Sequence, residues 1–244
     1  MGSVASRTLL AGTILMPQKA GNSLMPVAAA VGVIAQPARR ASVAVVLDDD
    51  RAREALAFQL DTAGVEVTSY ASAVELLVER DAINFDCVVS DIFLARINGL
   101  ELQERLRESG NFVSIVFVTG CADLSIGVRA MREGAVDVLE KPFEEKALLT
   151  AIAQGVRRTR AIRMEHTKRH DLERRLQSLP ARQRELFVLI TAGLLNKQAA
   201  AKMGITERTV KTHRERLRVR MGANSLLELS RMAEILQIHA PLGT

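Results

Sequence analysis

The stretch VVSDIFLARING, residues 88–99, decides the fold class of this chain. Its apolar start is typical of an internal strand of a parallel sheet, because helices cover both faces of such a strand. Asp91 follows at the point where this strand is expected to end. In open α/β sheets ligands bind at the carboxyl edge of the strands, so this carboxylate can belong to a site. It can equally open a turn, and the stretch alone does not decide between the two.

Four more short apolar runs flank this one and alternate with segments of helical periodicity. The predicted strands cover residues 43–47, 65–68, 86–90, 113–118 and 136–139. The predicted helices between them cover residues 51–63, 72–80, 99–108 and 124–133. Five strands that alternate with helices indicate an α/β domain with a doubly wound, flavodoxin-like parallel sheet, over residues 41–155. Right-handed crossovers bring the carboxyl ends of all five strands to one edge.

Polar side chains follow four of these strands. The first strand runs into LDDD (residues 47–50), the fourth ends at Thr119 and the fifth at Lys141. Carboxylates that converge with Asp91 would repel one another unless a cation joined them, and Mg²⁺ suits oxygen ligands with open water positions. Such an ion would neutralise phosphate oxygens while Asp91 attacks phosphorus in line. The predicted chemistry is acyl-phosphate formation on Asp91.

These motifs, in this order and at these spacings, resemble the receiver domain of two-component response regulators, most closely the FixJ-like group. The resemblance covers residues 43–155 and implies that Asp91 is the phosphoacceptor, a sensor histidine kinase the partner and Mg²⁺ the cofactor. It implies further roles around Asp91: the metal ligands Asp48, Asp91 itself and the main-chain carbonyl of Phe93, with Asp49 as a further candidate, the switch hydroxyl Thr119 and the phosphate-pairing Lys141.

Three positions depart from the receiver pattern. Leu47 stands where the first acid of a pair is usual, Ala95 where a proline is common, and Val138 where an aromatic ring usually rotates inward on phosphorylation. We expect the loss of an acid at Leu47 to weaken metal affinity. A one-residue shift would instead make Asp48 and Asp49 the acidic pair, and the sequence leaves both registers open. A receiver that only dimerises is the alternative interpretation.

Charge divides the chain into an acidic and a basic part. The formal net charge of +5 is the balance of +4 over residues 1–40, −10 over residues 41–147 and +11 over residues 148–244. The basic part indicates a polyanionic partner such as nucleic acid, although a solvated basic face without a partner is the alternative. Residues 156–178 are densely charged at helical periodicity, which predicts a helical linker.

Residues 179–240 carry the pattern of a helix-turn-helix. A helix is predicted over residues 181–193, followed by a short helix over 197–203, a turn at Gly204 and a longer helix capped by Thr206. The apolar stripe of this longer helix, Ile205, Val210, Leu217 and Met221, is expected to face inward. The residues expected to contact DNA phosphates or base edges are Lys197, Arg208, Thr209, Lys211, Thr212, His213, Arg214 and Arg218.

The stretch from Leu179 to Glu234 resembles the LuxR-type DNA-binding domain. The resemblance implies an all-α domain of four helices, of which the third reads double-stranded DNA and the fourth, near residues 225–237, offers a dimer surface. Gln183 stands where an acid is common; we expect a surface position and a loss of at most about 1 kcal/mol. RNA is disfavoured, because the chain has no Trp and its one Tyr, Tyr70, lies in the acidic part.

The two resemblances together predict a bacterial response regulator. A sensor histidine kinase would phosphorylate Asp91, the receiver would pair through residues 124–153, and the protein would control transcription as a switch and not as an enzyme. Leu47 and Val138 motivate an alternative, a DNA-binding regulator that works without phosphorylation. An aspartyl-phosphate hydrolase is disfavoured, because Phe93 stands where a second catalytic Asp would be needed.

The remaining features concern the amino-terminal segment and the cellular location of the protein. Residues 1–40 lack acids and any sustained period, so we expect disorder or a misassigned start, with Met16 or Met25 as alternative first residues. No apolar run reaches the roughly 20 residues of a membrane span. The two cysteines, Cys87 and Cys121, give no disulfide framework, which favours a reducing, cytoplasmic setting.

Overall fold

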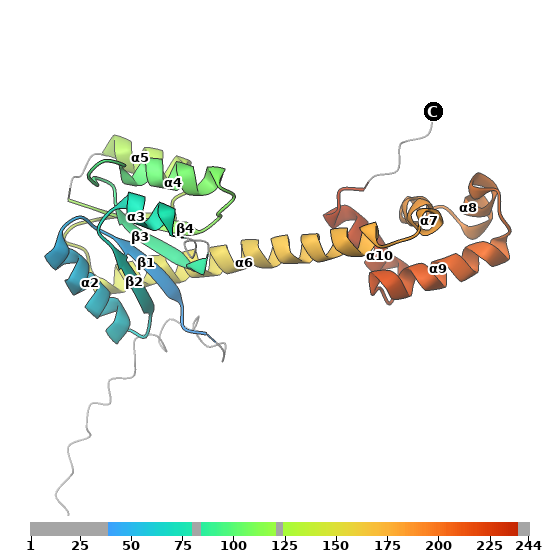
Figure 1. Cartoon of the computed structure of the whole chain (residues 1–244), viewed down its shortest axis with the longest axis horizontal. Coiled ribbons are helices and arrows are strands. Elements are labelled where there is room, and N and C mark those ends of the chain that lie inside the picture. Colours follow the sequence, from blue (N-terminus) through green and yellow to red (C-terminus); the bar gives the residue numbers. More distant parts are fainter. Residues whose placement is uncertain (1–38, 80–83, 121–123, 239–244) are drawn as a thin grey trace, which may run out of the picture.

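The computed structural model describes residues 39–79, 84–120 and 124–238. Figure 1 shows an α/β domain, one long helix that leaves it, and a second domain made of helices. The expectation of disorder for residues 1–40 falls mostly on residues 1–38, which lie outside the described residues, as does Cys121.

The sheet of the first domain has the predicted five parallel strands. They are β1 (Ser42–Val46), β2 (Glu66–Tyr70), β3 (Cys87–Asp91), β4 (Ser114–Thr119) and β5 (Asp137–Glu140). Their order across the sheet is β2-β1-β3-β4-β5. Every residue of β1, β3 and β4 is buried, whereas the edge strand β2 is mostly exposed. Continuous apolar runs therefore correctly marked the internal strands, since these are covered on both faces.

Helices cover both faces of the sheet. They are α2 (Asp50–Thr62), α3 (Ala73–Val78), α4 (Gly99–Glu108), α5 (Leu124–Arg132) and α6 (Glu145–Gln177). Alternate strand residues point to opposite faces, so β1 contributes Val45 to a core with α2 and α6, and Val46 to a core with α3 and α4. Three of the helices begin at a side-chain cap, provided by Asp49, Ser72 and Asn98.

The second domain contains the four predicted helices. They are α7 (Ala181–Thr191), α8 (Asn196–Met203), α9 (Glu207–Met221) and α10 (Leu226–Ile235). Gly204 ends α8 with φ 66°, a left-handed conformation that glycine adopts without steric cost, and Thr206 caps α9 by accepting from the amide of Thr209. Gln183 is only 4% exposed, so the expectation of a surface position is wrong: this side chain lies in the interior of the domain beside α7's buried apolar residues.

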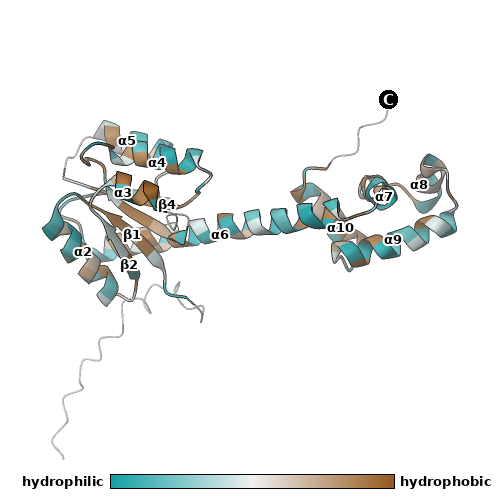
Figure 2. Cartoon of the chain, in the orientation of Figure 1, coloured by the Kyte–Doolittle hydropathy of each residue, from teal (hydrophilic) through white to brown (hydrophobic). Residues whose placement is uncertain are grey.

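The long helix α6 joins the two domains without a break over 33 residues. Its first turns bury Leu148, Ile152 and Val156 against the sheet, and its last turns place Leu172 and Leu176 in the core of the second domain. Between these ends its surface is mostly hydrophilic (Figure 2). The segment 156–178, expected to be a helical linker, thus belongs to the same helix as the last helix of the first domain, and both ends of α6 are packed.

Candidate functional site

Asp91 ends β3 and faces a lysine from the end of β5. Its side chain is 12% exposed, and its Oδ2 lies 2.6 Å from the Nζ of Lys141, 50 residues further along the chain. Its Oδ1 accepts a hydrogen bond of 3.0 Å from the amide of Phe93. The parallel sheet brings these groups together across β4, which lies between β3 and β5.

Thr119 lies between these two strands at the end of β4. It is 4% exposed, and its carbonyl accepts a hydrogen bond of 2.7 Å from the amide of Lys141. In the sheet register Asp91 pairs with Val118, so Thr119 stands one residue beyond Asp91 at the same edge. The structure therefore brings Asp91, Thr119 and Lys141 to one place, as predicted from the strand ends.

The acidic residues of the LDDD motif, which follows β1, have different environments. Leu47 is 2% exposed and packs in the core with α2 and α6, while Asp48 is the first exposed residue after the strand. Asp49 uses its Oδ1 to accept from the amide of Ala52 at 2.8 Å, which starts α2. Asp50 forms an ion pair with Arg53 on the exposed side of the same helix.

The candidate ligand atoms at this edge are carboxylate and carbonyl oxygens, the atom types that a hard divalent cation binds. Val46 pairs with Ser90, so the chain leaves β1 beside the end of β3 and brings Asp48 to the edge of Asp91. Within the described parts of the chain, no three acidic, histidine or cysteine side chains lie close enough to hold a metal ion. Two or three carboxylates were expected here, and Asp49, the further candidate, serves as the cap of α2. If Asp48, Asp91 and the carbonyl of Phe93 held Mg²⁺, positions for water and phosphate would remain on the ion.

A glycine fixes the loop that follows Asp91. A Cβ atom added to Gly99 would lie 2.5 Å from the carbonyl oxygen of Asp91 and 2.7 Å from the ring of Phe117. The amide of Gly99 also donates to the carbonyl of Ile92 at 2.8 Å, which closes the loop. Sequence reasoning missed Gly99, although a glycine at the first position of a predicted helix was a visible signal of a close approach.

Helix α9 has an inward and an outward face. Val210, Leu217 and Met221 are fully buried and Ile205 is half-buried, as the predicted stripe requires. The side chains exposed to solvent on this helix and on α8 include four of the expected DNA contacts, Lys197, Arg208, Lys211 and Thr212. Arg216 and Arg220 are also exposed and were not predicted, although both are basic residues on the same helix.

The other expected DNA contacts are half-buried, and three of them have polar partners within the domain. Thr209 shares a hydrogen bond with the capping hydroxyl of Thr206 at 2.9 Å, and Arg214 donates to the side chain of Asn196 at the start of α8. Arg218 lies 3.4 Å from Glu215, and the Nδ1 of His213 is buried without a hydrogen-bond partner among the described residues. Of these four side chains, Arg214 links α9 to α8 directly.

Two protein families match this chain. The family described as "Response regulator receiver domain" matches residues 43–153, and that described as "Bacterial regulatory proteins, luxR family" matches residues 177–233. The transcriptional regulatory protein FixJ of Azorhizobium caulinodans is 36% identical over 191 residues, which cover 78% of this chain and 90% of FixJ. The chain is a two-component response regulator of the FixJ-like group.

Further relatives of this response regulator agree with that assignment. Nodulation protein W of Bradyrhizobium diazoefficiens is 37% identical over 82% of this chain and 88% of its own length. The solved structure of the response regulator StyR is 37% identical, covers 80% of this chain and 99% of its own, and has a TM-score of 0.70. The fold is thus a receiver domain followed by a LuxR-type helical domain.

Two of the three departures of this receiver from its family, Leu47 and Val138, lie inside the packed structure, whereas Ala95 is exposed. Leu47 belongs to one core cluster, and Val138 is half-buried and packs against the other, the one that contains Phe117. Neither apolar side chain can supply a metal ligand or the motion of an aromatic ring.

No helix in the described ranges is both long and apolar enough to span a membrane.

Proposed function

We propose that a sensor histidine kinase transfers a phosphoryl group to Asp91 and that this modification changes how the protein binds DNA. One observation carries this proposal: the Nζ of Lys141 lies 2.6 Å from the carboxylate of Asp91, at a sheet edge that also holds the hydroxyl-bearing Thr119. Among the described residues Asp91 has one side-chain cation partner, Lys141, and a phosphoryl group can take over that partner.

The chemistry follows from the groups at this edge. A carboxylate oxygen of Asp91 forms a bond to phosphorus while the phosphorus–nitrogen bond of the donor's phosphohistidine breaks, and the electron pair returns to the imidazole ring. Lys141 then faces a phosphoryl oxygen, and the Thr119 hydroxyl can donate to another. Mg²⁺ held by Asp48, Asp91 and the carbonyl of Phe93 would neutralise charge on the phosphoryl oxygens. The modification adds negative charge and acceptor oxygens at the edge of the sheet.

The partner at the other end is double-stranded DNA. Arg208, Lys211 and Thr212 project from α9 with high exposure, and α9 is the recognition helix that the LuxR-type family implies. Such domains read paired half-sites as dimers, and we expect pairing of the active protein through residues 124–153. The exposed apolar side chains of Val128 and Met131 on α5 support this surface. The setting that we infer for a DNA-binding regulator of this kind is the cytoplasm.

A direct experiment treats the full chain with a small acyl-phosphate donor and Mg²⁺ and then measures binding to genomic DNA fragments by footprinting. We expect protection of paired half-sites at a lower protein concentration after treatment, and no such gain for Asp91→Asn. An Arg208→Ala variant should lose affinity by about 1–3 kcal/mol if the side chain reads a base, or lower the salt dependence if it binds phosphate. Equal protection with and without the donor would contradict the proposal.

A second candidate function is a DNA-binding regulator that does not depend on phosphorylation. Leu47 in the core and Val138 beside Phe117 favour it, because the receiver lacks one acid and the switching aromatic ring. It predicts the same footprint for the treated protein, the untreated protein and Asp91→Asn. The footprinting experiment therefore separates the two candidates.

A further inference from the structure

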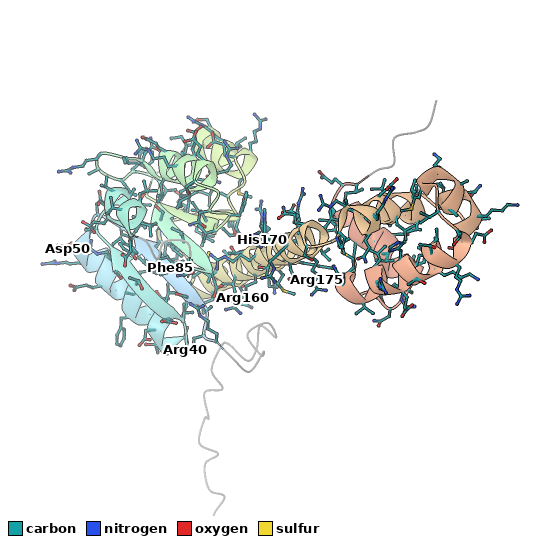
Figure 3. All side chains as sticks on the ribbon, turned by 45° about the vertical axis from the view of Figure 1, so that its right-hand side comes forward. Arg40, Asp50, Phe85, Arg160, His170 and Arg175 are labelled. Atoms are coloured by element: carbon teal, nitrogen blue, oxygen red, sulfur yellow. The ribbon has the colours of Figure 1, made fainter. Side chains whose placement is uncertain are left out.

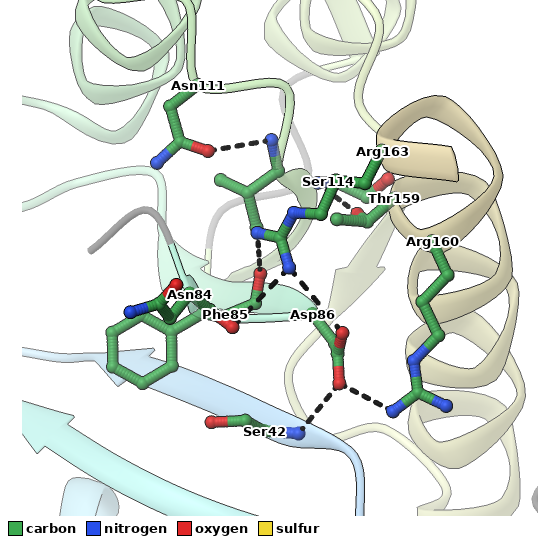
Figure 4. Close-up of polar contacts among 10 residues, drawn as sticks. Ser42, Asn84, Phe85, Asp86, Asn111, Ser114, Thr159, Arg160 and Arg163 are labelled. Carbon is green, nitrogen blue, oxygen red and sulfur yellow. Dashed lines mark hydrogen bonds and ion pairs between the residues drawn. The ribbon is translucent and has the colours of Figure 1, made fainter. Parts of the chain in front are cut away.

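A second buried carboxylate lies at the opposite edge of the sheet. Asp86 directly precedes β3, its side chain is 7% exposed, and it faces Arg160 and Arg163 from helix α6 (Figure 4). We call these three residues the Asp86 clasp. None of them belongs to the phosphoacceptor edge, and sequence analysis assigned no role to any of them.

The carboxylate of Asp86 is satisfied from several directions. Its Oδ2 accepts from Arg160 at 2.6 Å and from the amide of Ser42 at 3.2 Å. Its Oδ1 lies 3.6 Å from the guanidinium of Arg163. That guanidinium also donates to the carbonyl of Phe85 at 2.7 Å, so it holds both the acid and the backbone beside it. These charge-assisted hydrogen bonds offset part of the cost of burying the carboxylate and restrict its geometry.

The pKa of Asp86 agrees with a firm ion pair. Burial by itself would raise the pKa of this carboxyl, but the hydrogen bond from Arg160 opposes it, together with the Ser42 amide and the charges of both arginines. The net pKa lies below its ordinary value, so Asp86 is ionised at neutral pH. The same contact raises the pKa of Arg160.

Further contacts hold α6 along the amino edge of the sheet. The buried hydroxyl of Thr159 accepts from the amide of Ser114, the first residue of β4, at 2.9 Å. Gly155 allows a close approach, because an added Cβ would lie 2.7 Å from the Sγ of Cys87. One turn beyond the clasp, the ring of His166 stacks on Phe112 with centroids 4.8 Å apart. The receiver thus contacts α6 as far along the helix as His166.

The other end of the same helix is fixed to the DNA-binding domain. Arg175 donates to the carbonyl of Met221, the last residue of α9, at 2.9 Å, and Leu172 and Leu176 lie in that domain's core. Figure 3 shows Arg160 and Arg175 toward opposite ends of the exposed span of α6, with His170 between them. An ion pair within the helix, Arg169–Glu173 at 2.9 Å, supports the short stretch that neither domain covers.

We propose that the Asp86 clasp sets the direction in which the linker helix leaves the receiver, and thereby holds the DNA-binding domain in one orientation. An unbroken helix transmits a change of direction at one end to whatever is fixed at the other. Strand β3 joins the two edges, since Asp86 precedes its first residue and Asp91 is its last. The clasp is therefore built on the strand that carries the phosphoacceptor.

The test measures the orientation directly in the full chain, without DNA or a phosphoryl donor. Nitroxide labels are placed on cysteines introduced at two exposed positions, Glu54 on α2 and Lys202 on α8, and Cys121 is replaced by serine. Cys87 can stay, because burial raises the pKa of its thiol to about 12 and leaves it unreactive. Double electron–electron resonance then gives the distribution of distances between the two domains.

We expect one narrow distance peak for the wild-type clasp and a distribution at least twofold broader for Asp86→Asn. Arg163→Gln, which keeps the Asp86–Arg160 pair, should give intermediate broadening and decides the matter if Asp86→Asn does not fold. The matched control Glu173→Gln removes an ion pair of the same helix without touching the receiver, and should leave the peak narrow. A broad wild-type distribution, or a narrow one in a folded Asp86→Asn variant, would overturn the proposal. Because phosphorylation is not involved, this outcome is separate from the fate of the proposed function.

Discussion

The two ends of strand β3 each place a buried carboxylate against a basic side chain at 2.6 Å, yet they differ in what else surrounds it. Asp86 is held by two arginines of α6 and a backbone amide. In the described parts of the chain Asp91 is held by one lysine and one amide, and its side chain is somewhat more exposed, 12% against 7%. The same functional group serves to fix structure where its partners are many, and can accept a new bond where they are few.

The largest expected difference between the two acids is chemical. Asp91→Asn should abolish phosphorylation by a small acyl-phosphate donor, because an amide oxygen is a poor nucleophile and forms no acyl phosphate. Intact-protein mass spectrometry measures the added phosphoryl group. The matched control is Asp50→Asn, an exposed acid near the same edge, which should be modified as fully as the wild type. A modified Asp91→Asn protein would mean that another acid is the acceptor.

Two glycines sharpen the comparison, because each marks a close approach at one end of β3. Gly99→Ala should cost about 2–3 kcal/mol, since its methyl group would meet the rigid backbone of Asp91 and overpacking cannot relax there. Gly155→Ala should cost less, because its methyl group meets the side chain of Cys87 and alanine gains about 1 kcal/mol of helix propensity. Urea unfolding measures both.

The second glycine variant should be rescued by a smaller neighbour. Gly155→Ala combined with Cys87→Ala should show a favourable coupling of about 1 kcal/mol, because the sulfur that blocks the methyl group is gone. No side-chain change is expected to rescue Gly99→Ala. Additive costs in the Gly155 and Cys87 pair would show that the approach of α6 to β3 is looser than the structure indicates.

The stability of the two acid variants tests the comparison itself. Asp86→Asn should lower the free energy of unfolding by about 1–2 kcal/mol, because charge-assisted hydrogen bonds from two partly exposed arginines are weakened. Asp91→Asn should change it by less, since a single lysine loses its partner. Urea titration of both variants at neutral pH gives the two values. An equal loss would remove the distinction between a structural and a reactive carboxylate.

The smallest effect is a dependence on acid pH. Asp86 has a folded-state pKa below its unfolded value, so its contribution is fully present above the unfolded pKa, about 3.9, and disappears as pH falls through the lower folded pKa. The stability difference between wild type and Asp86→Asn should therefore stay constant from pH 7 to pH 5 and shrink below about pH 4. Urea unfolding at these pH values measures it. A difference that grows in acid would contradict the lowered pKa.

Much of this architecture follows from local pattern. Internal strands such as β3 show as apolar runs, helix starts show as capping residues such as Asp49 and Thr206, and the parallel topology then brings Asp91, Thr119 and Lys141 to one edge. The local sequence pattern could not predict which basic side chain pairs with each buried acid. Asp86 and Arg160 are 74 residues apart, and nothing local marks either as buried or paired.

Tertiary context gave two residues roles that their type did not indicate. Gln183 was expected at the surface but is buried, and Asp49, a further candidate metal ligand, caps a helix. Asp49 lies one residue before α2 and satisfies an amide at its start, and Gln183 lies on the side of α7 that packs in the core. Arg214 and Arg218 likewise turned partly inward, because long side chains on a helix can reach neighbouring elements.

The central proposal is that Asp91, and not the acids at positions 48 to 50, takes the phosphoryl group. The most direct test treats the full chain with an acyl-phosphate donor and Mg²⁺, reduces the acyl phosphate with borohydride, and maps the product by peptide mass spectrometry. We predict homoserine at position 91 and unchanged aspartate at positions 48, 49 and 50. Reduction at any of those three positions, or no reduced residue at all, would contradict the account.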